Sequence, residues 1–124
     1  VRRLHQLGYQ ILATAGTAAI LKRHGITTTV VRKRSDDEET AGEDIVDLIT
    51  AGKVDVVVNT PSGSSARKDG YEIRAATTAA DKAIFTTIAQ LSAAIGSFET
   101  VIAGPFTVKS LQEHSIDRKA ALAK

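Results

Sequence analysis

The spacing of hydrophobic and polar residues changes along the chain between a pattern typical of strands and a pattern typical of helices. Short apolar or β-branched runs predict strands at residues 9–13, 26–32, 54–58 and 83–85. Apolar residues spaced three and four apart predict helices at residues 17–24, 43–51, 66–82 and 87–95. Gly8, Gly25, Gly52 and Gly96 are read as helix ends. The polar segment 33–42 is expected to be a loop.

The part of the sequence after residue 98 has a weaker pattern. It predicts a short strand at residues 107–108 and a last helix from Ser110, where Glu113 would complete a capping box. Residues 1–8 already show helical spacing. We therefore expect the first strand to lie upstream and to be missing from this chain.

Alternation of strands and helices predicts an α/β fold. Parallel strands joined by right-handed helical crossovers make a three-layer, Rossmann-like sheet with helices on both faces. Because no linker, repeat or low-complexity segment interrupts residues 1–124, we expect one domain.

Composition narrows the classes of function. Only 4% of residues are aromatic and the net charge is +2, which argues against a nucleic-acid partner. The sequence has no cysteine, so disulfides and thiolate metal sites are excluded. No apolar run approaches the roughly 20 residues that span a bilayer. We expect no membrane partner and a cytoplasmic location.

Parallel topology places the carboxyl ends of all strands at one edge, where α/β sheets bind ligands. The first loop at that edge contains Thr14, Gly16 and Thr17, which open a helix. Amides at a helix N-terminus favour an anion, the threonine hydroxyls add donors, and Gly16 permits close approach or an unusual turn. The alternative is that Thr14 or Thr17 is simply an N-cap.

Three further loops add polar groups to the same edge. Lys33 follows the second strand, and its ammonium could pair with a phosphate or simply be solvated. The loop after the most apolar strand contains Asn59, Thr60, Ser62 and Gly63. These residues either contact a ligand or form an ordinary turn. Thr86 follows the last strand, beside Thr87, and either could cap the next helix. Together the loops predict a pocket for an anionic small molecule such as a phosphate ester.

Groups suited to catalysis are scarce in these loops. His5, His24 and His114 lie in or beside predicted helices, remote from the loops in sequence. The acidic run at residues 36–39 is continuous, unlike a tuned acid–base pair. Neither GxGxxG nor a Walker lysine motif occurs. The pattern therefore favours a binding function over catalysis. We expect no catalytic and no metal-binding residues.

Seven segments in order carry a family resemblance. They are ATAGTA at 13–18, VRK at 31–33, IVDLI at 45–49, VNTPSG at 58–63, DGYEIR at 69–74, TT at 86–87 and VKSLQEH at 108–114. With these, the chain resembles the methylglyoxal-synthase-like domain at the C-terminus of the carbamoyl phosphate synthase large subunit, over nearly its whole length.

The resemblance implies an allosteric domain that binds nucleotides. In bacterial members UMP inhibits and IMP activates. Thr14, Thr17 and Lys33 match phosphate-binding positions, Asn59 matches the effector pocket, and Thr86 matches a contact of ornithine, an activator in some members. Pro61 stands where some members have threonine, and a further phosphate lysine after the family's first strand has no counterpart here.

The resemblance also implies the wider enzyme. The parent makes carbamoyl phosphate for pyrimidine and arginine biosynthesis from bicarbonate, glutamine-derived ammonia and ATP with Mg or Mn, on other domains of the large subunit. A small glutaminase subunit completes the holoenzyme, and a homo-oligomer is possible. This domain itself is expected to need no cofactor.

Two alternatives stay open. Methylglyoxal synthase, a lyase of the same fold, carries Gly-Gly-Asp before the third helix and a catalytic histidine after the next strand. Here the first segment reads Thr-Ala-Gly-Glu-Asp at 40–44, with Asp44 close to the lyase aspartate, and no histidine occurs between His24 and His114. A flavodoxin-like or receiver-type interaction module would need a carboxylate where Asn59 stands.

Overall fold

The computed structural model describes residues 1–36, 39, 42–60, 66–105 and 107–123, with backbone alone for 66–68. The strands are β1 (Leu12–Thr14), β2 (Thr29–Arg32), β3 (Glu43–Asp44), β4 (Val56–Val58) and β5 (Ala83–Phe85). The helices are α1 (Arg2–Gln6), α2 (Ala15–Arg23), α3 (Ile45–Thr50), α4 (Ala66–Ala79), α5 (Ile88–Ala103) and α6 (Leu111–Leu122). The predicted α/β class is confirmed.

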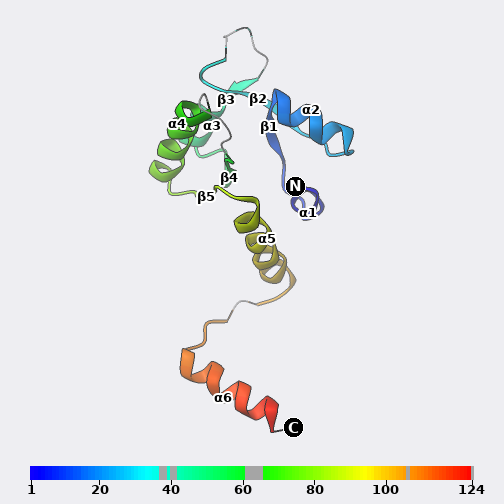
Figure 1. Ribbon diagram of the computed structural model, residues 1–124, viewed down its shortest axis with the longest axis vertical. Coiled ribbons are helices and arrows are strands. Elements are labelled where there is room, and N and C mark those ends of the chain that lie inside the picture. Colours follow the sequence, from blue (N-terminus) through cyan, green and yellow to red (C-terminus); the bar gives the residue numbers. More distant parts are fainter. Residues whose placement is uncertain (37–38, 40–41, 61–65, 106, 124) are drawn as a thin grey trace.

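All strand pairs are parallel, and they form two small sheets (Figure 1). In one sheet β2 lies between β1 and β3, with Thr14 opposite Val31. In the other β4 pairs with β5, and Val58 lies opposite Phe85. Within the described ranges β1 and β4 are not paired with each other. The strand expected upstream stays a prediction.

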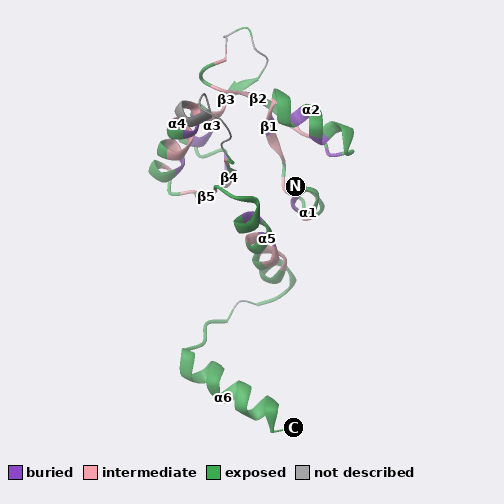
Figure 2. Cartoon of the chain, viewed as in Figure 1, coloured by how far each residue is buried: buried purple, intermediate pink, exposed green. Residues whose placement is uncertain are grey.

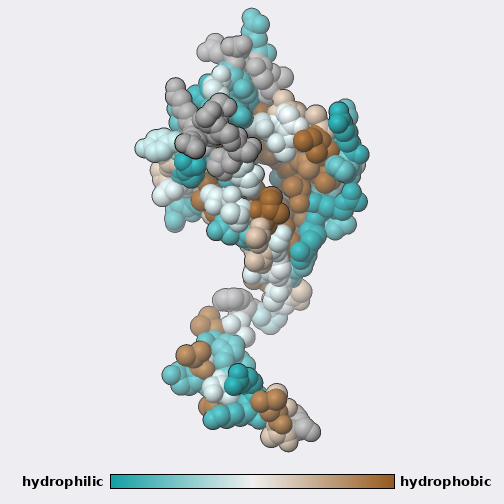
Figure 3. All heavy atoms as spheres, in the orientation of Figure 1, coloured by the Kyte–Doolittle hydropathy of each residue, from teal (hydrophilic) through white to brown (hydrophobic). Residues whose placement is uncertain are grey.

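A shared hydrophobic core joins the two sheets. Its buried members come from β2, α3 and the β4 segment: Val31, Leu48, Ile49, Val54 and Val57. Leu12 of β1 and Ile84 of β5 pack against the same cluster. Figure 3 shows hydrophobic side chains gathered near the centre of the upper part of the molecule. The sheets therefore hold their relative positions by aliphatic packing.

Helical spacing places Glu43 and Asp44 at the start of a helix, but they form β3 instead. Arg32 pairs with Asp44 in the parallel register, and Asp44 has extended dihedral angles, with φ −65° and ψ 126°. The Asp44 side chain caps α3, so the helix begins at Ile45, two residues later than predicted. Strand pairing and capping together override the helical spacing of this segment.

Gly96 is expected to end a helix, but α5 continues to Ala103. Glycine inside a helix costs about 1 kcal/mol relative to alanine. Contacts beyond Gly96 offset that cost: the Phe98 ring lies 6.0 Å from Tyr9 and 6.5 Å from Phe85. Arg3 donates to both carboxylate oxygens of Glu99 at 2.8 and 2.7 Å. Tertiary packing against the N-terminal segment and β5 therefore extends the helix.

The C-terminal segment stands apart from the rest (Figure 1). The strand predicted at residues 107–108 does not form, and Val108 is 85% exposed. The capping box of α6 is confirmed, with Glu113 N–H donating to Ser110 Oγ at 3.2 Å and Ser110 N–H to Glu113 Oε2 at 2.6 Å. Figure 2 colours α6 as exposed throughout. Its helix is therefore held by local interactions.

Candidate functional site

Thr14 links the end of β1 to the start of α2. It is the N-cap residue, with φ −65° and ψ 155°, but its side chain makes no capping hydrogen bond. The Thr14 hydroxyl therefore does not cap α2, although an N-cap is the alternative role for this residue. Thr17 lies in the exposed first turn of α2.

Gly16 does not form an unusual turn. It is helical and is not among the glycines with positive φ. A Cβ built there would meet nothing within 4 Å. Of the two roles open to Gly16, the unusual turn does not form, and close approach of a ligand stays a prediction.

Lys33 follows β2 and reaches across to α4. Its ammonium lies 3.5 Å from the Asp69 carboxylate, in the first turn of that helix. The Lys33 side chain is 40% exposed and the Asp69 side chain 18%. Asp69 belongs to one of the family-like segments, but the sequence indicates no role for it, because the two residues stand 36 positions apart. Only tertiary contact reveals this pair.

Asn59 follows β4 and carries an unpaired buried amide. Its backbone N–H donates to Phe85 O at 2.9 Å, which continues the pairing of β4 with β5. Its side-chain Nδ2 is buried and has no hydrogen-bond partner within the described part of the chain. Because an unmet buried donor costs free energy, this group calls for a partner.

The rest of the loop after β4 is only partly described. Thr60 is exposed. Ser62 and Gly63, which were predicted to contact a ligand, lie outside the described residues, as does Pro61. Their part in the site stays a prediction.

Thr86 and Thr87 join β5 to α5. Thr87 Oγ1 accepts from the Gln90 amide at 3.1 Å, so Thr87 is the N-cap. Thr86 donates to Gln90 Oε1 from its amide at 3.2 Å and from its hydroxyl at 3.3 Å. One of the two threonines therefore has the capping role, and Thr86 is held beside it in an exposed position.

Parallel pairing brings these groups together in two pairs. Thr14 ends β1 and Lys33 follows its partner β2. In the second sheet Asn59 follows β4 and Thr86 follows β5. The Lys33–Asp69 ion pair then joins the loop after β2 to the helix after β4. The topology thus supplies hydroxyls, an ammonium and an orphan amide at strand ends, a donor set suited to an anion.

Asp44 ends β3, and its carboxylate caps α3 and accepts a hydrogen bond from Arg34. It is 5% exposed and accepts from Val46 N–H at 2.8 Å, Asp47 N–H at 3.3 Å and Arg34 Nε at 3.4 Å. Burial acts to raise its pKa, but the two amides and Arg34 hold the pKa of Asp44 below its usual value. A carboxylate that is held ionised and hydrogen-bonded is a poor proton acceptor.

Other chemistry is sparse in the described residues. His5, His24 and His114 are exposed. No group of three metal-ligating side chains occurs within the described ranges. No helix in that part of the chain is both long and apolar enough to cross a bilayer.

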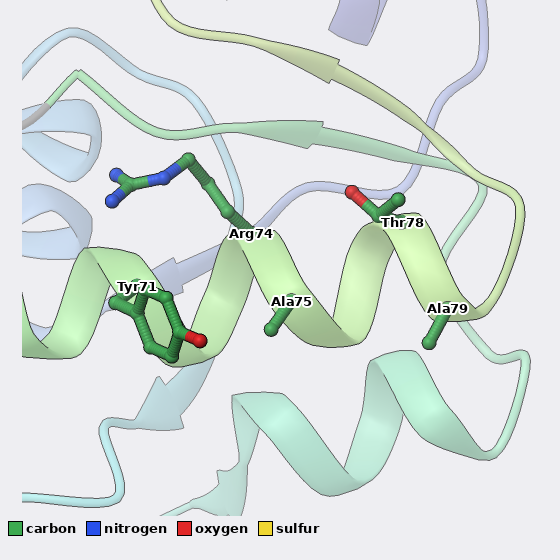
Figure 4. Close-up of a pocket in the computed structure, with 5 residues that line it drawn as sticks. All are labelled: Tyr71, Arg74, Ala75, Thr78 and Ala79. Atoms are coloured by element: carbon green, nitrogen blue, oxygen red, sulfur yellow. The ribbon is translucent and has the colours of Figure 1, made fainter.

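A hollow of about 480 Å³ lies along α4, away from the predicted site residues. All of its lining residues come from that one helix, as Figure 4 shows: Tyr71, Arg74, Ala75, Thr78 and Ala79. Ligand sites collect polar groups from several elements. This hollow therefore lacks the lining from several elements that is typical of a ligand site.

Comparison with known proteins identifies the family of the chain. The sequence profile of the MGS-like domain matches residues 1–86, from α1 to the residue after β5. The chain belongs to the MGS-like domain family. The matched range includes every predicted ligand-binding residue, and α5 and α6 follow it.

Relatives of this MGS-like domain are carbamoyl phosphate synthase large chains. The protein from Clavibacter michiganensis is 62% identical over 97% of this chain, and that from Beutenbergia cavernae 58% over 97%. The protein from Kineococcus radiotolerans is 51% identical over 98% of the chain. The chain spans 11–12% of the length of these relatives.

Proposed function

We propose that this MGS-like domain is the allosteric effector-binding unit of a carbamoyl phosphate synthase large chain, and that its effector is a nucleoside monophosphate, UMP or IMP. The phosphate would lie at the N-terminus of α2, against Thr14 and Thr17, with Lys33 as the counter-charge. Asn59 and the loop that follows it would contact the base or ribose. Ornithine would use Thr86.

The orphan amide of Asn59 carries this proposal furthest. Its buried Nδ2 has no partner within the described part of the chain. Asn59 follows β4 in the second sheet, whereas Thr14 and Lys33 lie at strand ends of the first. A ligand that accepts a hydrogen bond would satisfy it. The Thr14 hydroxyl makes no capping hydrogen bond, and the first turn of α2 is exposed. Both supply donors for the anionic part of that ligand.

Regulation is favoured over the lyase reaction by the state of Asp44. That reaction needs a carboxylate that exchanges a proton, whereas Asp44 is buried, caps α3 and has a lowered pKa. The histidines are exposed and lie in or beside α1, α2 and α6. The donor set therefore supports binding without chemistry.

The wider function is proposed from the relatives. The intact protein would make carbamoyl phosphate from bicarbonate, glutamine-derived ammonia and ATP on other domains, with a glutaminase subunit. Effector binding then changes activity only by favouring one state of the whole enzyme.

Calorimetric titration of the intact protein with UMP, and separately with uridine, tests the proposal. Uridine keeps the base and ribose but lacks the phosphate. We expect UMP to bind at least about tenfold more tightly, because charge-assisted hydrogen bonds at a helix N-terminus hold the phosphate. Equal affinities for the two ligands, or no heat with UMP or IMP, would refute a phosphate site.

A further inference from the structure

Asp69 and Lys33 form an ion pair beside the candidate site. Their charged atoms lie 3.5 Å apart, and they join the loop after β2 to the first turn of α4. Asp69 is the less exposed partner, at 18% against 40% for Lys33. The carboxylate has therefore lost most of its hydration and depends on the ammonium for compensation.

Among the described residues Lys33 is the one ion-pair partner that Asp69 has. The ammonium is half exposed and can reach a second anion on its open side. A phosphate bound to Lys33 would place its charge within a few ångströms of Asp69, where like charges repel. Anion and carboxylate thus compete for one cation.

We propose that Asp69 is an internal counter-ion, which occupies Lys33 in the empty site and must give it up when an anion binds. The inference rests on the proposed function, since it assigns Asp69 a role in the same site. Its consequence is selectivity for charge: an anion with two negative charges displaces the carboxylate, and one with a single charge competes poorly. Asp69 thereby sets how strongly charged an effector must be.

The test uses inorganic phosphate as the probe, so that contacts to a base or ribose play no part. In the intact protein, phosphate is titrated as a competitor of UMP, for the wild type and for Asp69→Asn. The substitution keeps the shape and removes the charge. Lys33 is 40% exposed, so solvent screens the pair, and a screened ion pair is worth up to about 1 kcal/mol. We therefore expect Asp69→Asn to bind phosphate about fivefold more tightly.

Asp117→Asn is the matched control. It also removes one carboxylate from an ion pair, with Lys109 at 2.6 Å, but on α6. We expect the affinity of this variant for phosphate to equal that of the wild type. A general effect of net charge would instead tighten both variants alike and would overturn the proposal.

Other results separate the inference from the proposed function. If UMP binds and phosphate competes equally, or less well, in Asp69→Asn, then Asp69 is not a competing counter-ion, although the effector site stands. If UMP binds to neither protein, the effector site and the counter-ion role both fail.

Discussion

Asp44 offers the sharpest test of how the segment beside the site is held. Its carboxylate caps α3 through the amides of Val46 and Asp47, and it lies 3.4 Å from Arg34 and 3.9 Å from Arg32. Asp44→Ala removes the cap and the charge together. Asp44→Asn keeps a side chain that caps a helix equally well and removes only the charge.

The magnitudes follow from these contacts. Loss of an N-cap costs about 1 kcal/mol, and loss of a hydrogen bond to a buried charged group about 1.5–3 kcal/mol. Arg34 is half exposed, so solvent screens part of the second contribution. We expect Asp44→Asn to lower the free energy of unfolding by about 1 kcal/mol and Asp44→Ala by about 2–3 kcal/mol.

Urea unfolding, followed by circular dichroism at pH 7 and at pH 3 or below, measures both effects. Because the pKa of Asp44 is lower in the folded than in the unfolded state, its charge stabilises the fold above about pH 4. That stabilisation is lost as the pH falls through the folded value. The gap between wild type and Asp44→Asn should therefore close in acid. Equal losses in both variants, or a gap that is as wide in acid as at pH 7, would refute the reasoning.

Glycine substitutions and the end of the chain give further predictions. Gly42→Ala should lower the free energy of unfolding by about 2–3 kcal/mol, because Gly42 has φ +112° and a Cβ there would lie 2.5 Å from Val30 O. Gly25 has φ +72° but open space around it, so Gly25→Ala should lower the free energy of unfolding by about 1–2 kcal/mol. Equal losses in the two variants would contradict the steric reasoning. Gly96→Ala should stabilise α5 by about 0.5–1 kcal/mol, because Gly96 is helical with nothing within 4 Å of its Cβ; a lower melting temperature would show that the space is needed. Truncation before Ser110 should leave the melting temperature unchanged, because α6 buries no residue; a drop would show that α6 packs on the rest.

Local patterns predict most of the elements because their causes are local. The β-branched run that contains Val30 and Val31 forms β2, and the Ser110–Glu113 capping box forms as its spacing requires. The order of loops along a parallel sheet follows from topology. For that reason the alternation of strands and helices is enough to assign Thr14 and Lys33 to one edge.

Predictions are wrong where distant residues decide the outcome. Gly96 does not end α5, because Phe98 and Glu99 pack against the N-terminal segment. Asp44 is not helical, because it pairs with Arg32 of β2 and its side chain caps α3. The role of Asp69 depends on a contact that crosses 36 positions of the sequence. Sequence spacing contains no signal for such contacts.

Comparison of UMP affinity between the wild type and the double variant Thr14→Ala, Thr17→Ala tests the central claim most directly. Both substitutions keep the helix and remove hydroxyls at its N-terminus. Thr27→Ala, an exposed threonine before β2, is the matched control. The account predicts that the double variant loses at least about tenfold in affinity while the control loses none. Unchanged affinity in the double variant would contradict an anion site at the start of α2.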